Sequence, residues 1–205
     1  PVIAIRSRWC YQKGIEPSLY ALRKYQFFKY AQLVVVSFRT DNDPKYTGLW
    51  YELKGWSTCH PQRICFLENP PHFAPLHYSG SDMLLMPSLY EPCGLVTLEA
   101  MRYGTAPIVR KTGGLADIVT PDVGFVIDWP VKEPLVKKDI ETGADLIMQA
   151  IEAAIVKYYQ PPQWEEIVRN AMSKDHSWQT RVPEYEALYQ QAIKFAEMRQ
   201  VLPFI

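Results

Sequence analysis

The stretch DMLLMPSLYEPCGLVTLEAMRYGTAPIV, residues 82–109, determines the fold class that the sequence predicts. Residues 83–87 and 106–109 are short and almost wholly apolar, which is typical of strands that are buried on both faces. Residues 95–103, between them, have the apolar spacing of a helix. A strand, a helix and a second strand in this order form the repeating unit of a parallel sheet. The stretch therefore predicts an α/β protein.

The rest of the chain extends this pattern. Apolar runs predict four further strands, at 2–6, 33–37, 64–67 and 124–127. Helices are predicted between them at 16–30, 45–54 and 73–79. Right-handed crossovers then give a doubly wound, Rossmann-like parallel sheet.

The pattern changes after residue 128, and the last third is predicted to be helical. Helices are expected at 142–159, 164–172 and 183–196. We therefore divide the chain into a Rossmann-like domain, 1–160, and C-terminal helices, 161–205, that pack on it. The first predicted strand starts directly after Pro1, so we expect the chain to be one domain of a longer protein.

Composition excludes several classes of function. The 205 residues carry 22 basic and 22 acidic side chains, so neither nucleic acid nor a membrane surface is an expected partner. The four cysteines form no C-x-x-C pair, which favours a reducing compartment over secretion. The four histidines lack ligand spacing, so we expect no metal site.

Ligands of doubly wound sheets bind beyond the carboxyl ends of the strands, so the turns that follow the strands are the candidate sites. In the first turn, Arg8 and Lys13 follow a strand and precede Gly14. Two such cations suit a diphosphate, because arginine donates a planar fork and lysine supplies a point charge. The alternative is that both are ordinary solvated charges.

The turn at 88–94 and the helix that follows carry most of the candidate residues. Backbone N–H groups of Gly94, Leu95 and Val96 open a helix whose positive end attracts an anion. Glu91 would lie at the mouth of this site and Glu99 to one side, where a carboxylate accepts from sugar or ribose hydroxyls. Both glutamates are equally compatible with solvated helix charges. Cys93 in this turn lacks a general base nearby in sequence and is not interpreted as a nucleophile.

Two further segments contain residues that could contact a ligand. Thr112, Gly113 and Gly114 follow another strand and precede a short helix, where glycine N–H groups either face an anion or simply make the turn. Tyr78 or Phe66 could stack on a base, although burial in the core is the commoner fate of such residues.

Taken together, these segments resemble a known family. The order SRWCYQKG (7–14), DMLLMPSLYEPCGL (82–95) and MRYGTAPIVRKTGGLAD (101–117) is similar to bacterial glycogen synthases and plant starch synthases. It matches the C-terminal, nucleotide-sugar-binding half of their GT-B fold, and NAMSKDHSW (170–178) resembles the start of the family's C-terminal helices. The resemblance implies that glucose is transferred from ADP-glucose or UDP-glucose to the non-reducing end of an α-1,4-glucan. Retention of configuration, no metal or other cofactor, and a partner N-terminal GT-B domain are also implied.

The resemblance also implies roles for the candidate residues. Arg8 and Lys13 would bind the donor diphosphate, and Glu91 would lie beside the transferred glucose. Glu99 would meet the ribose. The remaining substrate-binding residues would be those of the two turns under the phosphates: Cys93, Gly94, Leu95, Val96, Thr112, Gly113 and Gly114.

The sequence departs from the family pattern in two loops, at 37–44 and 68–75, and the family's acceptor-side motif K-x-G-G-L is absent. The isolated chain is therefore expected to be inactive, because catalysis needs closure of the two GT-B domains. The departures keep open the alternative of a non-catalytic module that binds glucan or another protein. A different retaining transferase, acting on sucrose or a lipid-linked sugar, is a third interpretation.

Overall fold

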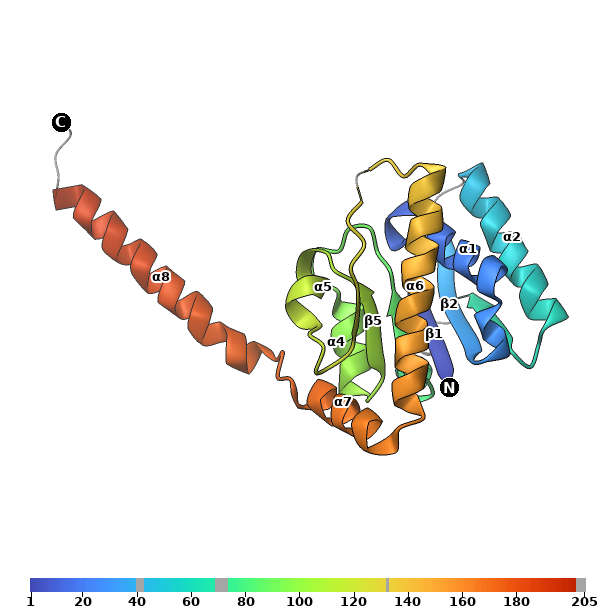
Figure 1. Ribbon diagram of the computed structural model, residues 1–205. Coiled ribbons are helices and arrows are strands. Elements are labelled where there is room, and N and C mark those ends of the chain that lie inside the picture. The colour runs from blue at the N-terminus through green and yellow to red at the C-terminus, as the bar shows by residue number, and fades with distance from the viewer. Residues whose placement is uncertain (40–42, 69–73, 132, 202–205) are drawn as a thin grey trace. The chain divides into compact units, whose positions relative to one another are not determined.

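The computed structural model describes residues 1–39, 43–68, 74–131 and 133–201 (Figure 1). Its centre is a six-stranded sheet in the order β3-β2-β1-β4-β5-β6 in which every neighbouring pair is parallel. The strands are β1 (Val2–Trp9), β2 (Gln32–Arg39), β3 (Ile64–Glu68), β4 (Met83–Met86), β5 (Ala106–Arg110) and β6 (Phe125–Ile127). This confirms the predicted doubly wound α/β fold.

Helices connect the strands and continue beyond the last one. The helices are α1 (Ile15–Tyr25), α2 (Pro44–Cys59), α3 (Ala74–Ser79), α4 (Leu95–Arg102), α5 (Gly113–Ile118), α6 (Lys137–Tyr158), α7 (Pro161–Ser173) and α8 (Trp178–Val201). Short 3-10 turns lie at η1 (Tyr11–Lys13) and η2 (Phe27–Lys29).

The boundaries differ from the sequence prediction where polar residues interrupt an apolar run. The first strand continues past the predicted end at residue 6, because all eight of its residues pair with β2, from Val2↔Gln32 to Trp9↔Arg39. The first helix ends earlier than predicted, at Tyr25, because Gln26 adopts a left-handed conformation with φ 50°. The predicted start of α3 at residue 73 lies outside the described residues.

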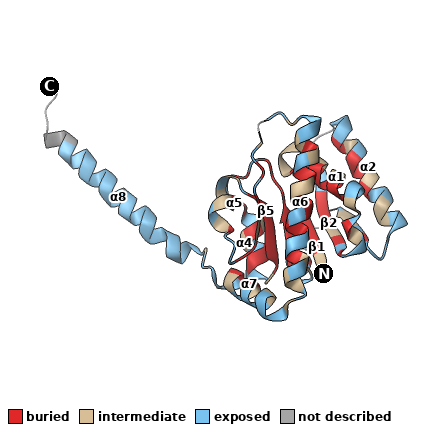
Figure 2. Cartoon of the chain, viewed as in Figure 1, coloured by how far each residue is buried: buried red, intermediate tan, exposed pale blue. Residues whose placement is uncertain are grey.

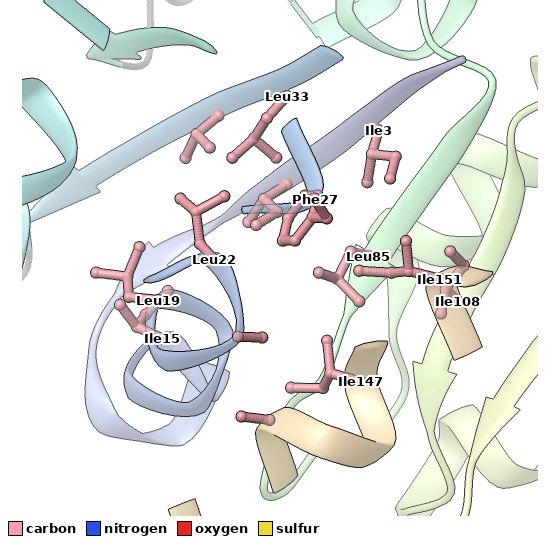
Figure 3. Packing of buried hydrophobic residues seen from close by; sticks show 14 of the residues in the cluster. Ile3, Ile15, Leu19, Leu22, Phe27, Leu33, Leu85, Ile108, Ile147 and Ile151 are labelled. Atoms are coloured by element: carbon pink, nitrogen blue, oxygen red, sulfur yellow. The ribbon is translucent and has the colours of Figure 1, made fainter. Parts of the chain in front are cut away.

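One face of the sheet is covered by α1, α2 and α6. Alternate residues of the central strands point into this layer, including Ile3 of β1 and Leu85 of β4. Figure 3 shows how the aliphatic side chains of α1 and α6 meet those of the strands. This layer is the larger of the two cores, and it fixes the position of β1 relative to β4.

The opposite face carries α3, α4, α5 and α7. Ala4 of β1 and Leu84 of β4 pack here against Tyr78 and Ala100, whereas Met86 packs with Leu115 of α5. The central strands therefore lie between two helical layers. β4 and β5 are buried along their whole length, and Figure 2 shows β5 in red. This double burial explains why the sequence shows continuous apolar runs without alternation.

The chain divides into two compact units, residues 1–173 and 174–205. The first extends past the boundary expected at residue 160, because α7 packs on α4 and α6. The second contains α8, whose described side chains are exposed along its length (Figure 2). In the described part of the chain, no helix is both long enough and apolar enough to span a membrane.

One buried histidine gives the first unit an expected pH dependence. His77 of α3 is 2% exposed, and desolvation by burial lowers the pKa of its imidazole below the ordinary 6.5. The unfolded chain then binds more protons than the folded one between the lowered pKa and 6.5, so acidification through this window destabilises the fold. We expect His77→Gln to lose less stability than the wild type between pH 7.5 and 5.5, measured by urea unfolding. Equal losses in the two proteins would contradict this.

Candidate functional site

A cleft lies at the carboxyl ends of β1, β2 and β4. Because β1 has β2 on one side and β4 on the other, this is where the strand order reverses, the usual ligand position in such sheets. The cleft has a volume of about 250 Å³. It is lined by Arg6, Ser7, Arg8, Lys13, Val36, Phe38, Met86 and Val96.

Arg8 and Lys13 both reach this cleft, as the sequence predicts. Arg8 is the penultimate residue of β1 and is exposed, and its Nη2 donates to Gln12 Oε1 at 2.8 Å. Lys13 ends η1, and its Nζ forms an ion pair with Glu91 Oε2. Their side chains are only 10% and 11% exposed, so the pair is largely removed from water. The sequence did not indicate that these two charges would meet.

The turn that carries Glu91 is fixed from two sides. The η1 turn supplies the first, since Gln12 O accepts from Leu89 N at 2.8 Å and Gln12 Nε2 donates to Tyr90 O at 2.8 Å. Arg110 supplies the second: it is 7% exposed, and its Nη1 donates to Leu89 O at 2.6 Å and its Nε to Trp129 O at 2.9 Å. Burial lowers the pKa of the Arg110 guanidinium. The turn that carries Glu91 is therefore held by contacts from η1 and from Arg110 at the end of β5.

The start of α4 lies next to this turn. Gly94 is its N-cap with φ 91°, and the first N–H groups of a helix lack intrahelical partners. Val96 lines the cleft, whereas Cys93 and Leu95 are exposed. A helix start of this kind can bind an anion, and that role for Gly94, Leu95 and Val96 stays a prediction.

The third turn packs against the second. Thr112 is the N-cap of α5, and its hydroxyl donates to Leu89 O at 3.4 Å. Gly114 N donates to Glu91 O at 3.0 Å. A Cβ on Gly113 would lie 2.1 Å from Glu91 O, and one on Gly114 would lie 2.5 Å from Cys93 O. The two glycines thus allow α5 to approach the turn of Glu91. This close packing is one reason why glycine stands at both positions.

Glu99 has a partner that the sequence did not suggest. Its Oε2 accepts a hydrogen bond of 2.7 Å from the hydroxyl of Tyr78, which is 1% exposed. Burial is the main cause that raises the pKa of Tyr78, and the bond to Glu99 adds to it. Tyr78 is therefore a core residue and not a stacking platform, and Phe66 likewise packs against Trp9 and Trp50.

Two cleft features were missed by the sequence analysis: Arg6 and the clamp formed by Arg110. Arg6 interrupts an otherwise apolar strand segment, and a charged residue at such a position is a signal that sequence reading can use. The importance of Arg110 depends on which carbonyls lie near it, and no local pattern indicates them. The loop departure at 68–75 falls largely on residues 69–73, and that at 37–44 includes residues 40–42, which lie outside the described residues.

The site as a whole is suited to an anion that also carries hydroxyl groups. Arg6, Arg8 and Lys13 line the cleft beside the first turn of α4, and Glu91 pairs with Lys13, so positive charge is in excess. In the described ranges, His, Cys, Asp and Glu side chains nowhere gather into a group of three or more that could hold a metal ion.

Comparison with known proteins gives a consistent picture. A sequence profile of "Glycosyl transferases group 1" matches residues 3–142. Glycogen synthase from Deinococcus deserti is 37% identical over 194 residues, 94% of this chain, and glycogen synthase from Protochlamydia amoebophila is 35% identical over 191 residues, 93% of this chain. Among solved structures, the catalytic domain of starch synthase IV from Arabidopsis thaliana, bound to ADP and acarbose, superposes with a TM-score of 0.73, at 26% identity over 95% of this chain.

The chain spans only part of each of these relatives. It covers 39% of the Deinococcus protein, 37% of the Protochlamydia protein and 38% of the plant catalytic domain. The similarity thus concerns one segment of proteins that are more than twice as long.

Proposed function

Because the chain belongs to the group 1 glycosyltransferases, we propose that it is the donor-binding half of a glucosyltransferase that extends an α-1,4-glucan. ADP-glucose or UDP-glucose is the proposed donor, and transfer is proposed to retain the configuration of the glucose. A second, N-terminal GT-B domain of the same protein would supply the acceptor side. A reducing compartment, the cytoplasm or the plastid stroma, belongs to this proposal, since all four cysteines are free.

The observation that carries the proposal is the meeting of Arg8, Lys13 and the start of α4 in one cleft at the switch point of the sheet. Departure of a nucleoside diphosphate places negative charge on the phosphate oxygens. Fixed cations and helix amides stabilise that charge without reorganisation, which lowers the barrier. The glycogen synthase relatives support glucan synthesis as the reaction in which this occurs.

The ion pair gives Glu91 a defined role in this proposal. Lys13 Nζ pairs with one oxygen of the carboxylate, and carboxylate oxygens accept hydrogen bonds from sugar hydroxyls. Glu91 then orients the glucose, and the leaving diphosphate itself assists attack from the same face. This route needs neither a covalent intermediate on Glu91 nor a separate general base.

Calorimetry on the 205-residue chain tests donor binding. We expect a dissociation constant below about 1 mM for ADP-glucose or UDP-glucose, an affinity that a few charge-assisted contacts supply. Arg8→Met should weaken binding about tenfold or more, because it removes a phosphate contact. Arg23→Met, on the outer surface of α1, is the control and should leave binding unchanged. No detectable binding of either nucleotide sugar at millimolar concentration would contradict the proposal.

A substitution in the full-length protein separates catalysis from a purely structural use of the fold. Glu91→Gln keeps the shape of the side chain and removes its charge. Under the proposed function, glucan synthesis falls steeply. Unchanged glucan synthesis in this variant would instead favour the non-catalytic, glucan-binding or protein-binding module.

A further inference from the structure

Arg6 is a charged residue of the cleft to which the proposed function gives no role. It lies in β1, opposite Val36 of β2 and two residues before Arg8, and it lines the same cleft. Its Nη1 is buried, and among the described residues this atom has no hydrogen-bond partner. A buried donor without a partner is unfavourable, so a donor of this kind that lines a cleft is a candidate contact for a ligand.

The walls of the cleft offer Arg6 no counter-charge. In the described part of the chain, the lining residues other than the three cations are uncharged: Ser7, Val36, Phe38, Met86 and Val96. The guanidinium carbon of Arg6 instead lies 5.8 Å from the ring centroid of Tyr78, and an aromatic face attracts a cation without neutralising it. Tyr78 is 1% exposed, and its backbone carbonyl accepts from Thr105 Oγ1 at 2.7 Å. Arg6 is therefore held beside a fixed ring with its charge uncompensated by the lining.

The three cations of the cleft differ in the partners that they already have. Lys13 Nζ pairs with Glu91 Oε2, so these two side chains together add no net charge. Arg8 is exposed, and its Nη2 donates to Gln12 Oε1 at 2.8 Å. Arg6 combines an uncompensated charge with a buried, unpaired donor. An anion in the cleft would gain most from this residue, because charge-assisted hydrogen bonds are stronger away from water.

The size of the cleft limits what this charge can hold. Its volume of about 250 Å³ is below the roughly 300–1,000 Å³ of pockets that enclose a whole small-molecule ligand. Arg6 and Arg8 lie two residues apart in β1, so both side chains leave the strand on the same face. Each guanidinium presents a planar fork of donors that fits phosphate oxygens. The cleft therefore suits a small anion with several phosphate oxygens.

We propose that Arg6 and Arg8 together bind a diphosphate group, and that free inorganic pyrophosphate occupies the cleft with no nucleoside or sugar attached. The contacts that favour binding are all made to phosphate oxygens, so the anion alone can make them. If the cleft also holds the nucleotide sugar proposed above, the free anion and the nucleotide sugar exclude each other. Only this competition rests on the proposed function, and binding of the anion does not.

Calorimetry with inorganic pyrophosphate tests the inference on the 205-residue chain, in buffer without divalent cations and at constant ionic strength. The wild type should bind with a dissociation constant below about 1 mM. Arg6→Met should weaken binding about tenfold, because it removes a charge-assisted contact. Arg6→Lys keeps the charge and should recover part of the affinity. The inference is overturned if the wild type shows no binding at millimolar pyrophosphate, or if Arg6→Met binds as tightly as the wild type.

Stability and a surface control show whether the effect is local. Arg6→Met removes an unpaired buried donor and keeps the apolar stem, so its urea midpoint should equal or exceed that of the wild type. Arg23→Met removes one positive charge from the exposed surface, where Arg23 pairs with Glu52, and should leave pyrophosphate binding unchanged. Equal weakening by Arg6→Met and Arg23→Met would reduce the effect to net charge and overturn the inference.

The two proposals fail in different ways. If pyrophosphate binds through Arg6 but neither ADP-glucose nor UDP-glucose binds, the inference stands and the proposed function falls. If a nucleotide sugar binds but pyrophosphate neither binds nor displaces it, the proposed function stands and the inference falls. When both hold, pyrophosphate displaces the nucleotide sugar competitively, and Arg6→Met weakens this displacement.

Discussion

Replacing Lys13 with methionine is expected to lower glucosyl transfer by the full-length protein about 100- to 1000-fold. Lys13 is one of two cations proposed to stabilise the departing diphosphate, and loss of a preorganised charge contact at a reacting group typically has an effect of this size. The loss should be in kcat as well as in kcat/KM, because the charge on the diphosphate grows as the bond breaks. Initial rates with the preferred nucleotide sugar and a glucan primer give both quantities.

The same substitution is also expected to lower the stability of the fold, separately from its effect on the rate. Lys13→Met leaves Glu91 largely buried without its partner, and we expect the free energy of unfolding to fall by roughly 2–3 kcal/mol. The double variant Lys13→Met with Glu91→Gln should recover most of this loss, because no uncompensated charge remains. The double variant should nevertheless stay inactive.

These two readouts distinguish the possible outcomes. If the double variant recovers both stability and activity, neither Lys13 nor Glu91 has its proposed role in glucosyl transfer. Lys24→Met serves as the matched control, since Lys24 also forms an ion pair, with Asp145, but on the exposed surface. It should leave the rate and the stability close to those of the wild type.

The sequence predicted the fold because the fold depends on local patterns. Each strand contains a short apolar run, and each run is followed by a helical period, so the order of elements was predicted correctly. Strand ends were less predictable. The first strand continues through Arg6 and Arg8, because backbone pairing with β2 tolerates any side chain that can reach a cleft or solvent.

The candidate site was predicted in its members but not in its contacts. The strand-turn-helix pattern indicated that Lys13 and Glu91 would lie near a common edge, because carboxyl ends of parallel strands share one edge. It did not indicate that they form an ion pair, or that Glu99 accepts from Tyr78, since these contacts depend on side-chain directions between segments distant in sequence. The clamp of Arg110 on Leu89 is of the same kind.

Gly113→Ala is expected to lower the free energy of unfolding by at least about 2 kcal/mol. Gly113 has φ 44°, a left-handed conformation that strains an alanine by roughly 1 kcal/mol or more. An added Cβ would also lie 2.1 Å from Glu91 O, a backbone atom that cannot move without shifting the turn. The hydrogen bond from Gly114 N to the same oxygen would be disturbed as well. Urea unfolding measures the change.

Gly55→Ala is the matched control for this effect. Gly55 lies in α2 with nothing within 4 Å of its added Cβ, so alanine should raise the free energy of unfolding by about 0.5–1 kcal/mol. The opposite signs separate the close approach at Gly113 from the general preference of helices for alanine. If Gly113→Ala also proved neutral or stabilising, α5 would not pack on the turn of Glu91 as described. Because that turn sets the position of Glu91, a shift of the turn should weaken nucleotide-sugar binding together with stability.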